Sequence, residues 1–476
     1  MKKHIYIFFI AFIAFAKISK GQIYTVSQSI DYGTANITTA APAAGSLTKA
    51  VIDAVNYLHS GGSVATIIIA TPGLIEMKGT IKIDGANAPG NIHYPYQPYN
   101  GGTIIFKAQT PTPWQQGFTI HTGTGSGTDC EYYDVNFVYM FLINISGASS
   151  VNFPVIEFDD LIFQDFYGEK NFNNSCSGFV TGSTNSRACI YTSSPLGVKF
   201  NVKGCEFINN NTDIYFSGNG NPTIPIATSS TLTVDGTSSN PQPIFTRNSI
   251  ANVYGTTLTD PSCSIFGTYF GNLVVRNGVF DFNNIPTPTG SQYQAAISIS
   301  AIGNSYGNVL PNLTVQYNTL RNYTAPFIHM RDAVSTSYLN ITGNWFHNTT
   351  SVYGAIYFAA GDYNSPIIDY NKFYSNTKDI VIDGGNNLLE FIKQPNPFGY
   401  AQKNYNNTFN YSNQYSNLSI KLNNYANSKV IGYPNLSEIQ TANNNVPNKG
   451  SIVRGNSIVN YTGAGVISSS AMTIGS

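Results

Sequence analysis

The chain has 476 residues, only 10% of them charged, and its 24 basic and 24 acidic residues give a net charge of zero. Nucleic-acid binding requires a basic surface, so this balance argues against a nucleic-acid partner. A single globular core seldom reaches this length, and no Pro-rich tract, charge block or low-complexity hinge divides the chain. The sequence therefore indicates an elongated repeat fold, in which each unit needs only its neighbours.

The first residues have the layout of a secretory signal. Lys2 and Lys3 precede an apolar run over 5–16, which is shorter than the roughly 20 residues that span a bilayer, and Gly21-Gln22 follows. We therefore predict a cleaved signal peptide over 1–21 and an exported protein, secreted or held at the cell surface. We do not expect an integral membrane protein. A mature chain that begins at Gln22 resembles exported proteins of the Bacteroidetes group.

The next segment predicts the only helix. Apolar residues recur at helical spacing over 46–59, Ser46 can cap the helix, and Gly61-Gly62 ends it. Such a helix would cover the open apolar end of a first coil. We therefore divide the mature chain into an N-terminal cap with the first coils, 22–110, and further coils over 111–476. Early strands are expected at 65–69, 79–83, 102–106 and 155–163.

Seven short segments from residue 205 onward share one register. Each has a small or amide residue in a first slot, most often Asn, and a large apolar residue two positions later. This alternation predicts a strand, and further apolar strands precede and follow it, so each unit has about three short strands. The first slots hold Cys205, Asn248, Gly278, Asn318, Asn344, Asn371 and Asn456, and the apolar slots hold Phe207, Ile250, Phe280, Leu320, Phe346, Phe373 and Ile458.

These units cannot bury their apolar faces alone and must stack. The short intervals between Asn318, Asn344 and Asn371 predict single coils, whereas the longer intervals predict coils with insertions or more than one coil. Stacking would form an inward apolar ladder and an Asn ladder at the corner. Asn suits that corner because it tolerates the left-handed backbone region and can bond its neighbour's amide. We expect Gly278 to replace it because Gly also enters that region freely. The pattern resembles the right-handed parallel β-helix repeats of the pectate-lyase-like superfamily, and this resemblance implies an all-β solenoid.

The acidic pair Asp159-Asp160 is the first candidate for a catalytic site. Adjacent residues on a strand point to opposite faces, so both carboxylates cannot line one cleft unless a turn intervenes. The pattern places them at a coil corner, before Leu161. We favour a solvated or turn-capping pair.

The second candidate is the cluster of His329, Arg331 and Asp332. The register puts His329 in the slot filled by Phe216 and Ile382 in other units, which predicts a core histidine. Arg331 falls where other units turn, so we favour a surface role. The catalytic residues therefore stay unassigned, with Asp159, Asp160, Arg331 and Asp332 as candidates.

No cofactor is expected. Polysaccharide lyases of the resembled superfamily bind calcium through clustered acidic residues, so calcium is implied only if this chain is lyase-like. The five cysteines, Cys130, Cys176, Cys189, Cys205 and Cys263, match no zinc or haem spacing, and their odd number leaves at least one unpaired. We favour buried free thiols over a disulfide framework.

Two functions compete. The first is a non-enzymatic scaffold, adhesin-like, whose partner is a polysaccharide or cell-surface glycan; a Tyr- and Asn-rich stretch over 400–433 favours sugar contact. The second is a polysaccharide lyase or glycoside hydrolase on the same fold, which rests on analogy. Carboxylates converging with Arg or Lys would favour the enzyme.

Overall fold

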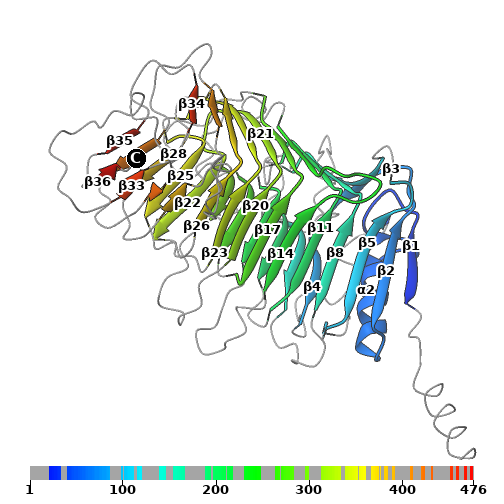
Figure 1. The fold of residues 1–476 in the computed structure, drawn as a ribbon. Helices are drawn as coiled ribbons and strands as arrows, with labels where there is room; N and C mark the ends of the chain where they lie inside the picture. Colours follow the sequence, from blue (N-terminus) through cyan, green and yellow to red (C-terminus); the bar gives the residue numbers. More distant parts are fainter. Residues whose placement is uncertain are drawn as a thin grey trace, which may run out of the picture.

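The computed structural model forms a parallel β-helix, and its described residues contain one helix and otherwise strands (Figure 1). No side chain beyond Asn376 is described. The described residues are 21–33, 40–85, 98–99, 101–111, 115–120, 139–145, 154–166, 188–193, 197–210, 212–217, 230–247, 263–268, 270–283, 295–299, 312–333, 338–351, 353–360, 366–374, 376, 380–383, 389–391, 408–410, 420–423, 430–431, 451–453, 457–459, 466–468 and 472–474. The predicted signal peptide lies outside them, apart from Gly21.

Three long parallel sheets, here named A, B and C, run along the solenoid. Each strand pairs with the equivalent strand of the next coil, so the predicted all-β parallel β-helix is confirmed. Sheet A contains β1 (Gln22–Val26), β2 (Val64–Ile69), β5 (Thr103–Ala108), β8 (Val155–Asp159), β11 (Lys199–Lys203), β14 (Thr231–Asp235), β17 (Asn272–Arg276), β20 (Asn312–Gln316), β23 (Tyr338–Thr342), β26 (Pro366–Asp369), β29 (Leu389–Phe391) and β32 (Val430–Ile431).

Sheet B follows sheet A within each coil. It contains β3 (Gly73–Met77), β6 (Gln116–Ile120), β9 (Ile162–Gln164), β12 (Glu206–Ile208), β15 (Ile244–Thr246), β18 (Val279–Asp281), β21 (Thr319–Tyr323), β24 (Trp345–Thr349), β27 (Lys372–Tyr374), β30 (Thr408–Asn410) and β34 (Ser457–Val459).

Sheet C completes the coil. It contains β4 (Ile81–Asp84), β7 (Tyr139–Asn144), β10 (Ala188–Ser193), β13 (Ile214–Ser217), β16 (Cys263–Thr268), β19 (Ala295–Ile299), β22 (Ile328–Ala333), β25 (Ile356–Ala360), β28 (Ile380–Asp383), β31 (Ile420–Asn423) and β35 (Val466–Ser468). A separate pair joins β33 (Ser451–Val453) to β36 (Met472–Ile474).

The helix α2 (Leu47–His59) lies beside the first strands of the solenoid (Figure 1). Ser46 caps it by accepting a hydrogen bond from the Lys49 amide at 3.3 Å. Its apolar side joins the common core and contacts β1, β2 and β4. Among the described residues, no helix has the length and apolarity that a membrane span requires.

Aromatic side chains stack along the inner face of sheet B. The rings of Phe207, Phe245 and Phe280 lie nearly parallel, with centroids 5.0 and 4.4 Å apart. Phe245 therefore fills the slot that the sequence assigned to Ile250, because the corner of this coil is longer than its neighbours and shifts the register. Asn248 and Ile250 themselves lie outside the described residues.

The same column continues through the later coils. Leu320, Phe346 and Phe373 follow Phe280 in register, and all three are buried. The column then passes through Phe409 to Ile458 by backbone pairing. The long interval before Asn456 thus contains one additional coil, at β30, in whose sequence Asn407 stands two residues before Phe409 as in the other units.

An Asn ladder lines the corner between sheets A and B. Asn344 Nδ2 donates to Asn371 Oδ1, and Asn318 Nδ2 donates to Asn344 Oδ1, both at 3.0 Å. The same Oδ1 atoms also accept the amides of Asn318 and Asn344. The ladder ends at Gly278, whose amide donates to Asn318 Oδ1 at 2.8 Å. Cys205 occupies the slot two coils earlier, and its thiol donates to the Phe158 carbonyl.

Of the two reasons predicted for Asn at this corner, the bond to a neighbour's amide is confirmed and the left-handed backbone is wrong. The left-handed backbone falls on the preceding residue, with φ of 57° at Tyr317, 68° at Gly343 and 51° at Tyr370, while Asn318, Asn344 and Asn371 have negative φ. Gly278 likewise lacks a left-handed φ, and a Cβ there would come within 2.9 Å of the Phe280 ring. Asn is used because its amide bridges two coils, and the residue before it makes the bend.

Candidate functional site

Three exposed aromatic side chains gather at the corner between sheets A and B, on three successive coils. They are Tyr317, Trp345 and Tyr370, with exposed fractions of 63%, 45% and 51%. In the described part of the chain, only Ile23 is a further large hydrophobic residue of comparable exposure. We call these three residues the aromatic corner.

The local backbone explains why these rings lie outside. Tyr317 and Tyr370 occupy the left-handed corner position, which projects their side chains away from the core. Gly343 takes the same position on the coil between them, and a Cβ there would lie 2.7 Å from the Tyr317 ring. A glycine therefore lets the Tyr317 ring extend over the next coil, two residues before Trp345.

A row of polar side chains continues from Trp345 across the outer face of sheet B. The Trp345 ring stacks on His347, with centroids 4.7 Å apart. His347 is in register with Arg321, and Arg321 with Asp281. Strands in a sheet lie about 4.8 Å apart, so these side chains form a continuous polar row beside the aromatic corner.

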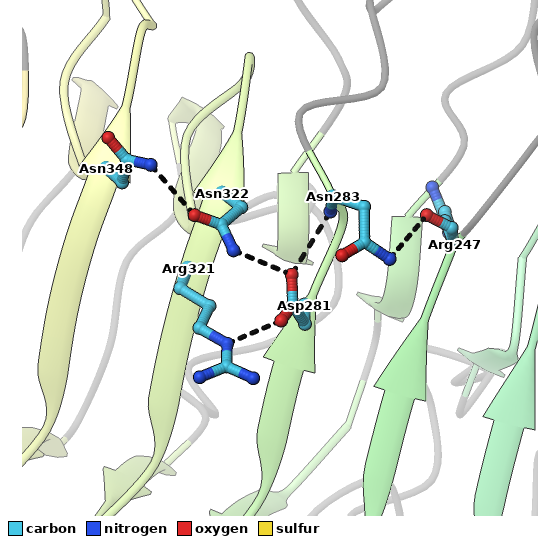
Figure 2. Close-up of polar contacts among 6 residues, drawn as sticks. All are labelled: Arg247, Asp281, Asn283, Arg321, Asn322 and Asn348. Carbon is cyan, nitrogen blue, oxygen red and sulfur yellow. Dashed lines mark hydrogen bonds and ion pairs between the residues drawn. The ribbon is translucent and has the colours of Figure 1, made fainter.

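Figure 2 shows the hydrogen bonds that Asp281 makes at one end of this row. Its carboxylate accepts hydrogen bonds from Arg321 Nε at 2.5 Å, Asn322 Nδ2 at 3.0 Å and the Asn283 amide at 3.1 Å. Asn348 Nδ2 extends the network by donating to Asn322 Oδ1 at 2.8 Å. Because Asp281 is 8% exposed and accepts three hydrogen bonds, its side chain is fixed and holds Arg321 in place.

The outer side of the row keeps hydrogen-bonding capacity. The Arg321 side chain is 42% exposed, and its hydrogen bond to Asp281 uses only Nε. Burial and the nearby Arg321 charge lower the pKa of His347, so this ring is neutral at pH 7. A neutral imidazole and a guanidinium can both donate to uncharged hydroxyl groups.

The candidate pair Asp159 and Asp160 is split, as the sequence predicted for neighbouring residues. Asp160 lies in the corner with φ of 58°, is 4% exposed, and accepts hydrogen bonds from Thr237 at 2.6 Å and Asn240 at 2.9 Å. These bonds fix the loop between β14 and β15, at the corner two coils later, so Asp160 has a structural role. Asp159 ends β8 and faces outward on sheet A, with Glu157 on the same side.

Asp159 belongs to a small charged cluster that sequence reasoning missed. Glu157 Oε2 accepts hydrogen bonds from Lys203 Nζ at 2.7 Å and Asn201 Nδ2 at 2.9 Å. Burial raises the pKa of Glu157, but these two hydrogen bonds outweigh it and bring the pKa below its usual value. Burial and the Glu157 charge raise the pKa of Asp159 to about 7. The two carboxyl groups therefore hold one proton between them near neutral pH.

This arrangement predicts how stability depends on pH. Burial raises the pKa of Asp31 to about 7 and that of Asp213 to about 6, in the same direction as Asp159. Between about pH 4 and 7 these three carboxyl groups keep protons in the folded chain that they have lost in the unfolded chain, which lowers stability as pH rises. The pKa of His329, lowered to about 3 by burial, acts in the opposite direction, but it is one group against three. We expect the melting temperature to be a few degrees higher at about pH 5.5 than at about pH 8. Asp159→Asn should make the difference in melting temperature between these two pH values smaller. An unchanged difference would contradict the raised pKa of Asp159.

The second candidate cluster lies elsewhere. Arg331 is on β22 of sheet C, so the structure does not bring it together with Asp159 or Asp160. The side chain of Asp332 lies outside the described residues. His329 is wrongly predicted as a core residue, because Met330 and not His329 pairs with Phe358 in the inward slot. The error is one residue of strand register, which turns the side chain to the other face.

The remaining sequence candidates form no metal site in the described residues. No three His, Cys, Asp or Glu side chains lie there in a group that could hold a metal ion. Cys189, Cys205 and Cys263 are buried free thiols, and Cys130 and Cys176 lie outside the described residues. The side chains of the Tyr-rich stretch at 400–433 also lie outside them.

Comparison with known proteins gives no family for the chain. No protein-family model matches it, and no curated protein matches its sequence.

Proposed function

We propose that this chain is an exported protein, secreted or held at the cell surface, whose β-helix is a non-enzymatic scaffold that binds an extended glycan. In this proposal the fold is the right-handed form of the pectate-lyase-like superfamily, and α2 caps its first coil. The observation that carries the binding function is the aromatic corner, with one exposed ring on each of three successive coils.

The geometry of the corner suits a sugar chain that runs along the solenoid axis. Successive coils are about 4.8 Å apart, so Tyr317 and Tyr370 are separated by about 10 Å along this axis. Consecutive pyranose rings repeat at about the spacing of one coil, so each aromatic ring of the corner can contact one sugar. Aromatic faces bind the apolar faces of sugars, while Arg321 and His347 offer hydrogen bonds to hydroxyl groups.

The test is a binding measurement on a glycan array, followed by calorimetry with the oligosaccharides that bind. Trp345→Ala should weaken binding about 30-fold, since loss of a central Trp contact costs about 2 kcal/mol. Affinity should rise steeply up to three sugar units and then level off. Tyr338→Ala, on sheet A of the same coil, is the matched control and should bind like the parent.

The proposal fails if Trp345→Ala and Tyr338→Ala bind equally well, or if no glycan binds the parent protein. Because the Trp345 side chain is outside the core, Trp345→Ala should keep the parent melting temperature, which separates lost binding from lost folding.

The second candidate function is a polysaccharide lyase or glycoside hydrolase, and one observation favours it. Glu157, Asp159 and Lys203 bring a proton-sharing carboxyl pair next to a lysine, which are groups that such enzymes use as acid and base. Incubation with acidic polysaccharides should then release unsaturated products or new reducing ends. If product release is lost in both Asp159→Asn and Lys203→Gln, the chain is such an enzyme and this cluster is its catalytic site. If release persists in both variants, the cluster is not a catalytic site.

A further inference from the structure

Three tyrosine rings stack on one another along the outer face of sheet C, on the successive strands β7, β10 and β13. Tyr215 lies between the core residues Ile214 and Phe216, so its ring points outward, and Tyr191 is in register with it. The centre of the Tyr191 ring lies 4.4 Å from that of Tyr139 and 4.8 Å from that of Tyr215, with interplanar angles of 22° and 35°. We call these three residues the tyrosine stack, and Tyr191 is its central ring.

The hydroxyl groups of the tyrosine stack also lie near one another. Burial raises the pKa of Tyr139, and the neighbouring hydroxyl groups of Tyr191 and Tyr215 raise it further. Tyr139 is therefore a neutral phenol at physiological pH. In each ring the two ortho carbons flank the carbon that carries the hydroxyl, so stacked rings with neighbouring hydroxyl groups also bring ortho carbons of different tyrosines together.

The surroundings of the stack limit where an oxidised tyrosine can react. The next residue in register after Tyr215 is Phe266, whose ring centre lies 4.7 Å away. A phenyl ring has no hydroxyl group, so an oxidant that removes an electron and a proton from tyrosine does not oxidise it in the same way. All three tyrosines are partly buried, so solvent reaches them while packing restricts their movement. A radical formed on one of them therefore has another tyrosine of the stack as its nearest reaction partner.

Another pair of tyrosines in the described residues makes a useful comparison. The rings of Tyr353 and Tyr357 have centres 5.1 Å apart, but both residues belong to one coil. A bond between them would close only a short local loop. A bond within the tyrosine stack would instead join two coils, β7 to β10 or β10 to β13, which are otherwise held together by backbone hydrogen bonds and side-chain packing.

We propose that the tyrosine stack is a site of oxidative modification, at which Tyr191 couples to Tyr139 or to Tyr215 and forms a dityrosine bond between adjacent coils. The oxidant is a peroxide that acts through a one-electron oxidant of the haem-peroxidase class. This site lies on a different sheet from the aromatic corner, so the inference does not depend on the glycan proposal.

The coupling balances in atoms and electrons. Each of the two tyrosines loses one electron and its phenol proton and becomes a phenoxyl radical. The two radicals form a carbon–carbon bond between their ortho carbons, and each of these carbons then releases its hydrogen as a proton while a proton returns to the oxygen. The two electrons and two protons reduce one hydrogen peroxide to two water molecules, so the protein loses two hydrogen atoms in all.

The test is oxidation of the full chain in dilute solution with hydrogen peroxide and a haem peroxidase. A second arm uses persulfate with a photoactivated ruthenium complex, which needs no enzyme to reach the stack. The monomer is isolated by gel filtration, and its proteolytic peptides are mapped by mass spectrometry. In at least one arm the parent monomer should contain the peptide of Tyr191 joined to that of Tyr139 or Tyr215. This link should be lost when the chain is unfolded in urea before oxidation.

Single hydroxyl deletions identify the partners. Tyr191→Phe should lose both links, since two coils separate the outer rings by about 10 Å. Tyr139→Phe can keep only the link to Tyr215, and Tyr215→Phe only the link to Tyr139, so these two variants keep the test decisive if Tyr191→Phe does not fold. Tyr338→Phe is the matched control and should couple like the parent. Tyr338 is also partly buried on the outer face of a sheet, but it contacts no tyrosine ring among the described residues.

The proposal is overturned if neither arm gives a dityrosine that contains Tyr191 in the parent monomer, whether coupling then occurs between molecules, at other tyrosines or not at all. It is also overturned if the link at Tyr191 forms equally well in the chain unfolded in urea, because coupling would then not depend on the stack.

Discussion

Phe346→Asp should destroy the folded state of the central coils. Phe346 is 0% exposed, stacks on Phe373 at 5.1 Å, and lies in register with Leu320. The substitution removes an aromatic side chain worth about 3–5 kcal/mol and leaves a carboxyl group without a partner in the apolar interior. We expect insoluble protein, or a fall in melting temperature of about 10 °C or more, measured by circular dichroism.

Trp345→Asp is the matched control for this prediction. It places the same charge one residue earlier on β24, on the outer face, where the side chain reaches solvent. It should therefore melt within a few degrees of the parent. If both variants melt alike, the inner face of sheet B is not a buried apolar column.

The stacking of coils was predictable because the inward column repeats residue by residue. Phe207, Phe280, Phe346 and Phe373 fill one slot in the sequence pattern and one column in the structure. Prediction was wrong where a coil departs from the common corner length. Phe245 fills its slot without a following Asn to mark it, so the pattern selected Ile250 instead.

The aromatic corner was visible in the sequence but was not recognised. An aromatic residue adjoins the Asn slot in three successive units, at Tyr317-Asn318, Asn344-Trp345 and Tyr370-Asn371. The exposure of Tyr317 and Tyr370 follows from the left-handed backbone of the residue before Asn, a conformation that the sequence pattern assigned to Asn itself. Glu157 and Lys203, by contrast, come from strands of different coils, and only the register between β8 and β11 brings them together.

The Asn ladder and the aromatic corner depend on the same spacing between coils. Each Asn amide fixes the distance between two coils. The bends before Asn318 and Asn371 project Tyr317 and Tyr370 outward, and Trp345 follows Asn344 on the outer face of β24. The spacing of the exposed rings is therefore determined by buried hydrogen bonds. A change in the ladder should alter both stability and the proposed glycan binding.

Asn344→Ala should destabilise the protein by about 3 kcal/mol, although Asn344 makes no contact outside the corner. The substitution removes the acceptor of the Asn318 amide and the donor to the Val315 carbonyl and to Asn371 Oδ1. Buried groups left without partners cost about 1–3 kcal/mol each, which exceeds the loss for one exposed hydrogen bond. The measurement is the free energy of unfolding in urea. Asn340→Ala, on the outer face of sheet A in the same coil, should lose less than about 1 kcal/mol.

Asn344→Asp distinguishes hydrogen bonding from packing. The aspartate has the same shape and still accepts from the Asn318 amide, but it cannot donate to the Val315 carbonyl or to Asn371 Oδ1. If the ladder acts through its donors, Asn344→Asp should be at least as destabilised as Asn344→Ala at neutral pH, and it should recover part of the loss in acid, where its carboxyl group is protonated. Parent-like stability at neutral pH would mean that the corner depends on side-chain shape alone, and that the coil spacing beneath Tyr317, Trp345 and Tyr370 has another origin.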